Sequence, residues 1–172
     1  MSDLGGFDPA SIAETVEYVA IRRLQDAYAD VVTRRAWDEL DDIFLPDGVV
    51  ELDTRQGDMI RMDGPHELGE FISRAIEQFD FFEFVTLNTR IEIGAAGRAH
   101  TADARLYMCE LRTDRETRQW NNAFGVYHDR YRRRDNQWWF AHRRYHSLAR
   151  PAADGVTVDA FDFPRHLKLG DL

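Results

Sequence analysis

Apolar residues in the first part of the chain recur at intervals of three and four positions. In chain order they are Ile12, Val16, Val19, Leu24, Tyr28, Val31 and Val32. This spacing places them on one side of an amphipathic helix. Asp8 and Pro9 precede them, and an aspartate cap followed by proline favours a helix start. The pattern therefore predicts a helix that ends near Arg35.

Two further segments continue the helical spacing. The second predicted helix carries Trp37, Leu40, Ile43 and Phe44, and Pro46-Asp47-Gly48 would end it. Short strands are expected over 49–53 and 59–62. Asp63-Gly64-Pro65 resembles a helix start, and the apolar side of this third predicted helix carries Leu68, Phe71, Ile72, Ala75 and Ile76.

After Phe79 the apolar period changes from about four to two, which is typical of strands with one buried face. We expect four long strands, over 84–93, 99–112, 119–133 and 137–148. The last two meet at Asp135-Asn136, a pair that tolerates the left-handed backbone of a two-residue hairpin turn. Helices followed by antiparallel strands predict an α+β fold, with the helices packed on one face of a curved sheet.

Length and charge narrow the function classes. The 172 residues suit one domain, expected over 10–150, with a mobile N-terminal segment at 1–9 and a C-terminal tail at 151–172. A net charge of -9 would repel nucleic acid phosphates and anionic lipid. We therefore expect neither a nucleic acid nor a membrane as partner.

Cysteine and histidine usage gives no sign of a metal or a disulfide. Cys109 is the one cysteine in the sequence, so an internal disulfide is excluded. The histidines are scattered and have no metal-ligand spacing, and we expect no cofactor. Without a signal peptide or a long apolar run, a cytoplasmic location is the default prediction.

Three marks follow one another along the chain. They are the helix with Tyr28, the segment Trp37-Asp38-Glu39-Leu40 followed by Phe44-Leu45-Pro46-Asp47, and the final hairpin with Gly125-Val126-Tyr127 and Trp138-Trp139-Phe140. Over about 21–148, this order resembles the SnoaL-like branch of the nuclear transport factor 2-like superfamily. The resemblance implies a cone, in which a bent antiparallel sheet wraps three N-terminal helices and encloses a deep apolar pocket. Members are mostly small cofactor-free enzymes, including dehydratases, ketosteroid isomerase and polyketide cyclases; they are often homodimers or larger, and some only bind a small apolar ligand.

The proton-moving groups of these relatives are missing here. Dehydratase-like members use an aspartate late in the first helix and a histidine on the first long strand, and the resemblance places these positions at Thr33 and Phe84. Neither side chain is a useful base near neutral pH. The position of the ketosteroid isomerase aspartate falls at Leu52, and its neighbours Glu51 and Asp53 point to the other face of a strand.

Other family positions keep polar or small side chains. The resemblance gives Tyr28 the role of polarising a ligand oxygen, with a purely structural core position as the alternative. Asn88 would hydrogen-bond a ligand or face solvent, and Tyr127 would lie in the pocket wall. The candidate ligand-binding residues are Val32, Thr33, Leu52, Phe84, Asn88, Tyr107, Ala123 and Gly125.

The hairpin offers a substitute for the missing base. A two-residue turn at 135–136 places Asp129 opposite His142 and Tyr127 opposite Arg144, and opposed residues share a face. An imidazole held by a carboxylate can act as acid or base. We therefore predict Tyr28, Tyr127, His142 and Asp129 as the catalytic set. The alternatives are a cross-strand ion pair on the outer side of the sheet and a register slipped by one residue.

Three functions remain open. The first is a cofactor-free lyase or isomerase that acts on an apolar cyclic substrate, such as a steroid, polyketide or terpenoid. The second is a binding protein without catalysis, and the third is an assembly role like that of the small subunits of aromatic-ring dioxygenases. The tail with Phe161 and Phe163 resembles the segment that covers the pocket mouth in scytalone dehydratase, and a dimer contact is its alternative.

Overall fold

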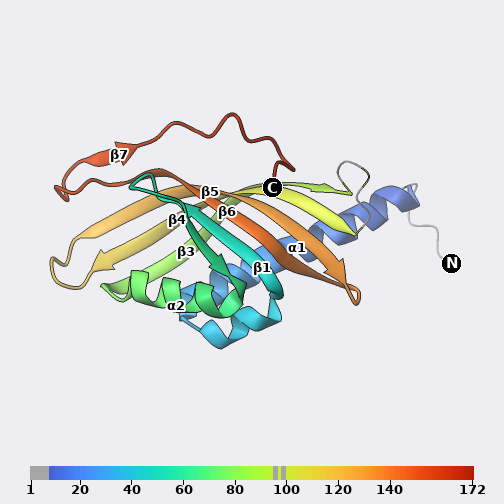
Figure 1. Ribbon diagram of the computed structural model, residues 1–172, viewed down its shortest axis with the longest axis horizontal. Coiled ribbons are helices and arrows are strands. Elements are labelled where there is room, and N and C mark those ends of the chain that lie inside the picture. The colour runs from blue at the N-terminus through green and yellow to red at the C-terminus, as the bar shows by residue number, and fades with distance from the viewer. Residues whose placement is uncertain (1–7, 95–96, 98–99) are drawn as a thin grey trace.

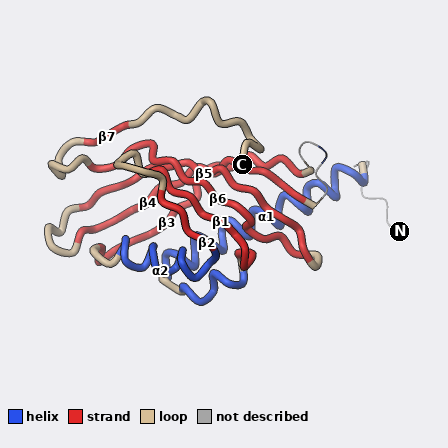
Figure 2. The backbone as a smooth tube through the Cα atoms, viewed as in Figure 1, coloured by secondary structure: helices blue, strands red, loops and turns tan. Residues whose placement is uncertain are grey.

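Helices and a curved sheet form two layers, with the C-terminal tail as a third (Figure 1). The computed structural model describes residues 8–94, 97 and 100–172. Most of the segment expected to be mobile, 1–9, and the expected strand start at Ala99 lie outside the described residues. The described elements, which Figure 2 colours by type, are α1 (Pro9–Arg34), a 3-10 helix η1 (Trp37–Asp42), β1 (Phe44–Asp53), β2 (Ile60–Asp63), α2 (Gly64–Ile76), β3 (Phe79–Ile93), β4 (Thr101–Asp114), β5 (Trp120–Arg134), β6 (Gln137–Pro151) and β7 (Val158–Ala160).

The first helix starts and ends as its sequence predicts. The Ser11 backbone N–H donates to the Asp8 carboxylate at 3.3 Å, which caps the helix N-terminus. Arg35 follows the last turn in the left-handed conformation, with φ of 59°. None of the described helices is both long enough and apolar enough to span a membrane.

The second predicted helix is shorter than expected. It is a six-residue 3-10 helix, and Phe44 already belongs to β1, which runs through Pro46-Asp47-Gly48. Phe44 pairs with Phe140 of β6, and the two rings stack with centroids 4.8 Å apart. This contact with a distant strand removes Phe44 from the helix that its local spacing predicted.

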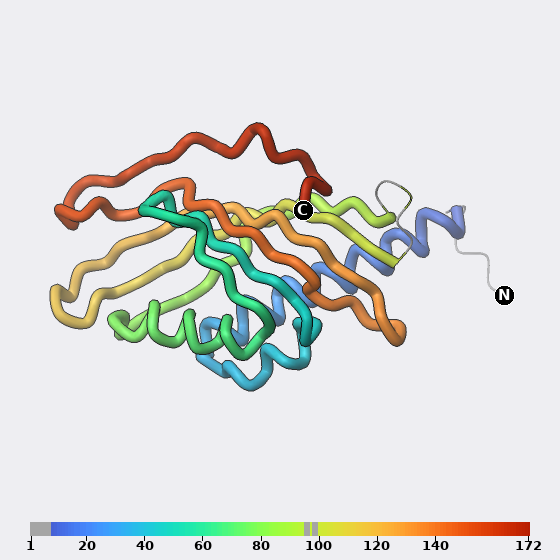
Figure 3. The backbone as a smooth tube through the Cα atoms, viewed as in Figure 1, coloured from blue at the N-terminus to red at the C-terminus, as the bar shows by residue number. Residues whose placement is uncertain are grey.

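Within the described residues, seven strands form one sheet in the order β2-β1-β6-β5-β4-β3, with β7 paired to β6. Figure 3 follows the same path by chain position. The neighbours are antiparallel except β1 and β6, which are parallel. The α+β prediction is confirmed, and the sheet is mixed rather than purely antiparallel.

The final hairpin has the predicted turn but a different register. Asp135 and Asn136 have φ of 52° and 63°, the left-handed conformation that the turn needs. Tyr131 pairs with Phe140, but Arg130 pairs with His142, so β6 contains one extra residue, a β-bulge. From Arg130 to Gly125 every partner is displaced by one, and a second irregularity between Gly125 and Phe124 shifts the register again.

Side chains of the sheet alternate between two faces. Those of Leu106 and Met108 join the core on the side where α1 and α2 lie (Figure 1); we call this the helix-covered face and the opposite side the outer face. The tail, residues 152–172, runs over the outer face. Its Phe163 stacks on Tyr107 with ring centroids 6.1 Å apart, and the Leu167 carbonyl accepts from the Arg105 guanidinium at 3.1 Å.

The tail therefore packs on the outer face at Tyr107 and Arg105, while its Phe161 ring lies 5.3 Å from the guanidinium of Arg150, which lines the pocket described below. That the tail covers the pocket mouth stays a prediction. A dimer contact through the tail stays a prediction.

Two histidines are buried on the outer face. His128 and His146 are 3% and 4% exposed, and their rings contact edge to face at 5.6 Å. The Arg105 Nε donates to His128 Nε2 at 3.2 Å. Burial, reinforced by Arg105 for His128 and by His128 for His146, lowers both pKa values to about 4.

We predict that acidification destabilises the fold through these histidines. Below pH 6.5, their ordinary pKa, the unfolded chain takes up protons that the folded protein refuses until about pH 4. The free energy of unfolding should thus fall by on the order of 1–2 kcal/mol per histidine between about pH 7 and about pH 5. Urea denaturation at both values measures it. The variant with His128→Gln and His146→Gln should flatten the dependence, whereas the exposed His66→Gln should leave it; an unchanged double variant would contradict this account.

Candidate functional site

A cavity of about 230 Å³ lies between α2, the C-terminal half of α1 and the helix-covered face of the sheet. We call it the pocket. Most of its walls are apolar, from Val32, Leu52, Leu68, Phe71, Ile72, Ala75, Ile76, Phe79, Phe82, Phe84 and Ala123. Its polar lining consists of Tyr28, Thr54, Gln78, Glu110, Arg112, Tyr127, Tyr145, Ser147 and Arg150. An apolar body with a few polar groups on the wall is typical of small-molecule sites.

Two tyrosines from different elements meet at the pocket wall. Tyr28 of α1 and Tyr127 of β5 contact each other with ring centroids 6.4 Å apart. Burial raises the pKa of both hydroxyls, although the Arg143 charge opposes it. Both hydroxyls therefore stay protonated at neutral pH and are able to donate hydrogen bonds.

A buried ion pair supports the tyrosines. The Arg143 guanidinium lies 4.2 Å from the ring centroid of Tyr28 and 4.0 Å from that of Tyr127. Its Nε and Nη2 donate to the two Asp129 oxygens at 2.8 and 3.0 Å. Asp129 also accepts from the Tyr131 hydroxyl at 2.8 Å. Asp129 is thus occupied by Arg143 and is not available to orient a histidine.

His142 lies on the outer face. Its Nε2 is 2.9 Å from the Glu51 carboxylate, and the same Glu51 oxygen accepts from Arg144 at 2.7 Å. The predicted pairing of Asp129 with His142 and of Tyr127 with Arg144 is wrong. Because of the bulge in β6, Asp129 lies opposite Arg143, and Tyr127 lies opposite Tyr145. His142 and Arg144 contribute nothing to the pocket lining.

The two positions without the expected proton-moving groups are joined to each other. The Phe84 backbone N–H donates to the Thr33 hydroxyl at 3.0 Å, which ties α1 to β3. The Phe84 ring faces the pocket and lies edge to face with Tyr28 at 5.4 Å. Thr33 does not line the pocket, so its hydroxyl positions the helix on the sheet.

The other predicted ligand-binding residues divide into two groups. Val32, Leu52, Phe84 and Ala123 line the pocket. Asn88 is exposed at an irregularity of β3, Tyr107 packs under the tail, and Gly125 is covered by the Tyr145 ring. None of these last three residues lines the pocket. Register irregularities and tertiary cover, which the alternation pattern does not contain, account for all three.

Gly125 makes room for a side chain of the protein rather than for a ligand. A Cβ atom at this position would overlap the Tyr145 ring, and Tyr145 lines the pocket. We predict that Gly125→Ala lowers the free energy of unfolding by about 1–3 kcal/mol, the usual cost of overpacking. Urea denaturation measures this loss. In combination with Tyr145→Ala the two losses should be less than additive; full additivity would contradict the proposed overlap.

The sequence interpretation missed Glu110. This residue of β4 lies opposite Phe84 on β3 and opposite Ala123 on β5, so its carboxyl group belongs to the same wall as the position of the missing histidine. The side chain is 24% exposed and lines the pocket. Burial raises its pKa, and Arg112, whose Nη1 donates to Glu110 Oε2 at 3.2 Å, partly opposes the increase.

A signal for Glu110 is present in the sequence. It follows Leu106 and Met108 at intervals of two, so it shares their face of the strand. A carboxylate that continues an apolar strand face is an unusual neighbour for a core. This observation would have placed Glu110 among the candidates.

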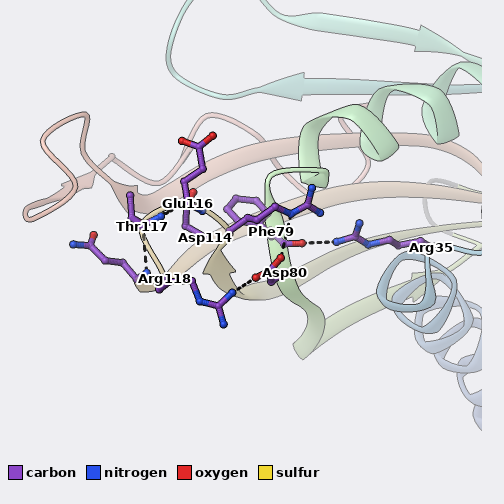
Figure 4. A network of polar contacts seen from close by, with 9 residues as sticks. Arg35, Phe79, Asp80, Asp114, Glu116, Thr117 and Arg118 are labelled. Carbon is purple, nitrogen blue, oxygen red and sulfur yellow. Dashed lines mark hydrogen bonds and ion pairs between the residues drawn. The ribbon is translucent and has the colours of Figure 1, made fainter.

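Polar contacts join the segments around Phe79 and Arg112, the part of the pocket that we call the mouth. The Arg35 guanidinium donates to the Phe79 carbonyl at 2.7 Å, and Phe79 lines the pocket. Figure 4 shows this contact beside the ion pair of Arg118 with Asp80 and the Asp114–Thr117 turn. The network connects the end of α1, the start of β3 and the β4–β5 hairpin. Within the described residues, no group of three histidine, cysteine, aspartate or glutamate side chains is placed to hold a metal ion.

Comparison with known proteins agrees with this architecture. Similar solved structures include hexachlorocyclohexane dehydrochlorinase LinA-type3 from Novosphingobium barchaimii LL02, which is 19% identical with a TM-score of 0.69 over 90% of this chain and 99% of that one. Rv3472 from Mycobacterium tuberculosis, of unknown function, is 22% identical with a TM-score of 0.67 over 83% and 78%. An NTF2-like protein with a cystatin-like fold from Novosphingobium aromaticivorans is 16% identical with a TM-score of 0.65 over 84% and 92%.

At these identities the solved structures support the fold alone, and no curated protein sequence gives a match. The family assignment comes from the sequence model of the SnoaL-like domain, which matches residues 13–144. That range runs from α1 into β6 and includes Tyr28, Glu110 and Tyr127. The chain therefore belongs to the SnoaL-like domain family, on the nuclear transport factor 2-like fold.

Proposed function

We propose that this protein is a cofactor-free lyase or isomerase for an apolar cyclic substrate, such as a steroid, polyketide or terpenoid, and that Glu110 moves the proton. The observation that carries the proposal is that Glu110 lines an apolar pocket and that burial raises the pKa of its carboxyl group. A raised carboxyl pKa is typical of an acid–base catalyst near neutral pH.

The tyrosines supply the second half of the chemistry. In this proposal the ionised Glu110 removes a proton from a carbon next to a carbonyl group, and the C–H electron pair moves toward the carbonyl oxygen. The hydroxyls of Tyr28 and Tyr127, kept protonated by their raised pKa values, donate to that oxygen. Return of the proton to another carbon gives isomerisation, and departure of a leaving group gives elimination.

Proton exchange tests the proposal before a natural substrate is known. Cyclic ketones such as β-tetralone and androstenedione would be incubated in deuterated buffer, and α-deuteration followed by NMR. The wild-type protein should accelerate exchange above the buffer rate, and Glu110→Gln should not. Wild-type exchange equal to buffer, or full exchange with Glu110→Gln, would overturn the proposal.

A binding protein without catalysis is the second candidate. The absence of acid–base side chains at Thr33 and Phe84, which instead join α1 to β3, favours it. In that case β-tetralone should bind with wild-type affinity to Glu110→Gln, and the wild-type protein should leave its α-protons unexchanged.

A further inference from the structure

Arginines give the pocket mouth a charge opposite to that of the whole chain. The charged residues that line the pocket are Glu110, Arg112 and Arg150, whereas the chain carries a net charge of -9. The pocket wall therefore carries two arginines but one carboxylate, so one positive charge has no negative partner on the wall.

Arg150 carries most of this argument. It lies near the end of β6, and no carboxylate among the described residues forms an ion pair with it. Its Nε is buried without a hydrogen-bond partner, and its guanidinium lies 5.3 Å from the Phe161 ring centroid. A buried N–H without a partner is costly, so this group is suited to an acceptor that a ligand brings.

Arg112 is held in place on the neighbouring part of the wall. Its Nε donates to Asn121 at 2.8 Å, and its guanidinium lies 4.9 Å from the Phe79 ring centroid. Only 14% of its side chain is exposed. Its single carboxylate partner among the described residues is Glu110.

Glu110, Arg112 and Arg150 all influence the pKa of the Tyr145 hydroxyl. The pKa of Tyr145 is raised to about 12, chiefly by burial; Glu110 adds to the increase, while Arg112 and Arg150 oppose it. Both arginines line the same pocket as Tyr145. Along β4, Arg112 follows Glu110 by one step on the same face, about 7 Å in a strand.

We propose that the substrate is a cyclic carboxylic acid, whose carboxylate binds Arg150 and Arg112 at the mouth while its rings lie against Phe79, Phe82 and Phe84. This inference rests on the proposed function, since it names the substrate class for the same pocket. It also sets the order along the wall: the carboxylate at the arginines, the reacting carbon at Glu110, and the polarised oxygen at Tyr28 and Tyr127. A planar carboxylate suits guanidinium groups, which bind it through paired N–H donors.

Binding of two matched probes tests the proposal without any reaction. Naphthoate carries the carboxylate, and naphthalenemethanol is its neutral counterpart. Calorimetry on the wild-type protein should show naphthoate binding roughly 10- to 100-fold more tightly, the effect expected of hydrogen bonds to a charged group. Rising salt should weaken naphthoate binding alone.

Arg150→Met should remove this preference and leave naphthalenemethanol binding within about twofold. The matched control is Arg90→Met, which removes an exposed arginine paired with Glu92 on β3 and should change neither affinity. Arg150→Gln repeats the test if the methionine variant is less stable. Equal binding of the two probes by the wild-type protein, no binding of either, or wild-type naphthoate affinity in the Arg150 variants would overturn the proposal.

Glu110→Gln separates this inference from the proposed function. It should keep or tighten naphthoate binding, because it removes a negative charge beside the arginines, while it abolishes proton exchange. If neither the wild-type protein nor any variant accelerates proton exchange, the catalytic role of Glu110 is rejected. If naphthoate binding still depends on Arg150 in that case, the carboxylate site is retained.

Discussion

Glu110→Gln is expected to slow proton exchange by about 10²- to 10⁴-fold, the usual contribution of a positioned general base. Glutamine keeps the shape of the side chain and the contact with Arg112 but has no basic oxygen. The loss should therefore appear in kcat rather than in probe binding. Initial rates of α-deuteration for the two proteins, at matched ketone concentrations, measure it.

The dependence of the exchange rate on pH shows in which protonation state Glu110 acts. A base works only when ionised, so the wild-type rate should rise with pH through a midpoint above 4.5, the ordinary glutamate value, because burial raises the Glu110 pKa. Glu83→Gln is the matched control, since Glu83 is an exposed residue on the adjacent strand β3 and should leave the rate unchanged. A rate that falls as pH rises through that midpoint would identify Glu110 as an acid and contradict the base assignment.

Asp129→Ala is expected to lower the free energy of unfolding by about 3–5 kcal/mol, because it leaves a buried charge without its partner. Asp129 and Arg143 both have fully buried side chains, and Arg143 lies against the rings of Tyr28 and Tyr127. Burial opposes the charge of Arg143, while Asp129, followed by Tyr28 and Tyr127, favours it and raises the Arg143 pKa. Removal of Asp129 therefore takes away the main group that compensates for burial of this charge. Urea denaturation at neutral pH measures the loss.

Paired substitutions show whether the loss arises from the unpaired charge. Asp129→Leu combined with Arg143→Met should be more stable than Asp129→Ala alone, since neither variant side chain carries a charge. Asp58→Ala, at an exposed position, is the control and should change stability little. A double variant that is no more stable than Asp129→Ala would show that the packing around Tyr28, rather than charge, accounts for the loss.

Local patterns in the chain were sufficient for most of the architecture. The helical spacing around Tyr28, the cap at Asp8 and the turn at Asp135-Asn136 each depend on neighbouring residues, and the structure contains all three. The resemblance to the family depends on the order of short segments along the chain, and the family model, which matches residues 13–144, confirms the family. Val32, Leu52, Phe84 and Ala123, which the sequence proposed as ligand-binding residues, line the pocket.

The identity of the residue proposed to move the proton could be found only from contacts between segments that are distant in the sequence. One extra residue in β6 exchanged His142 for Arg143 opposite Asp129, because a single-residue change of register sends the side chains to the other face of a strand. The pKa of Glu110 is raised by burial, which only the assembled helices and sheet create. Periodicity along a chain reports which residues share a face, but the charge state and the partner of each residue are properties of the packed environment.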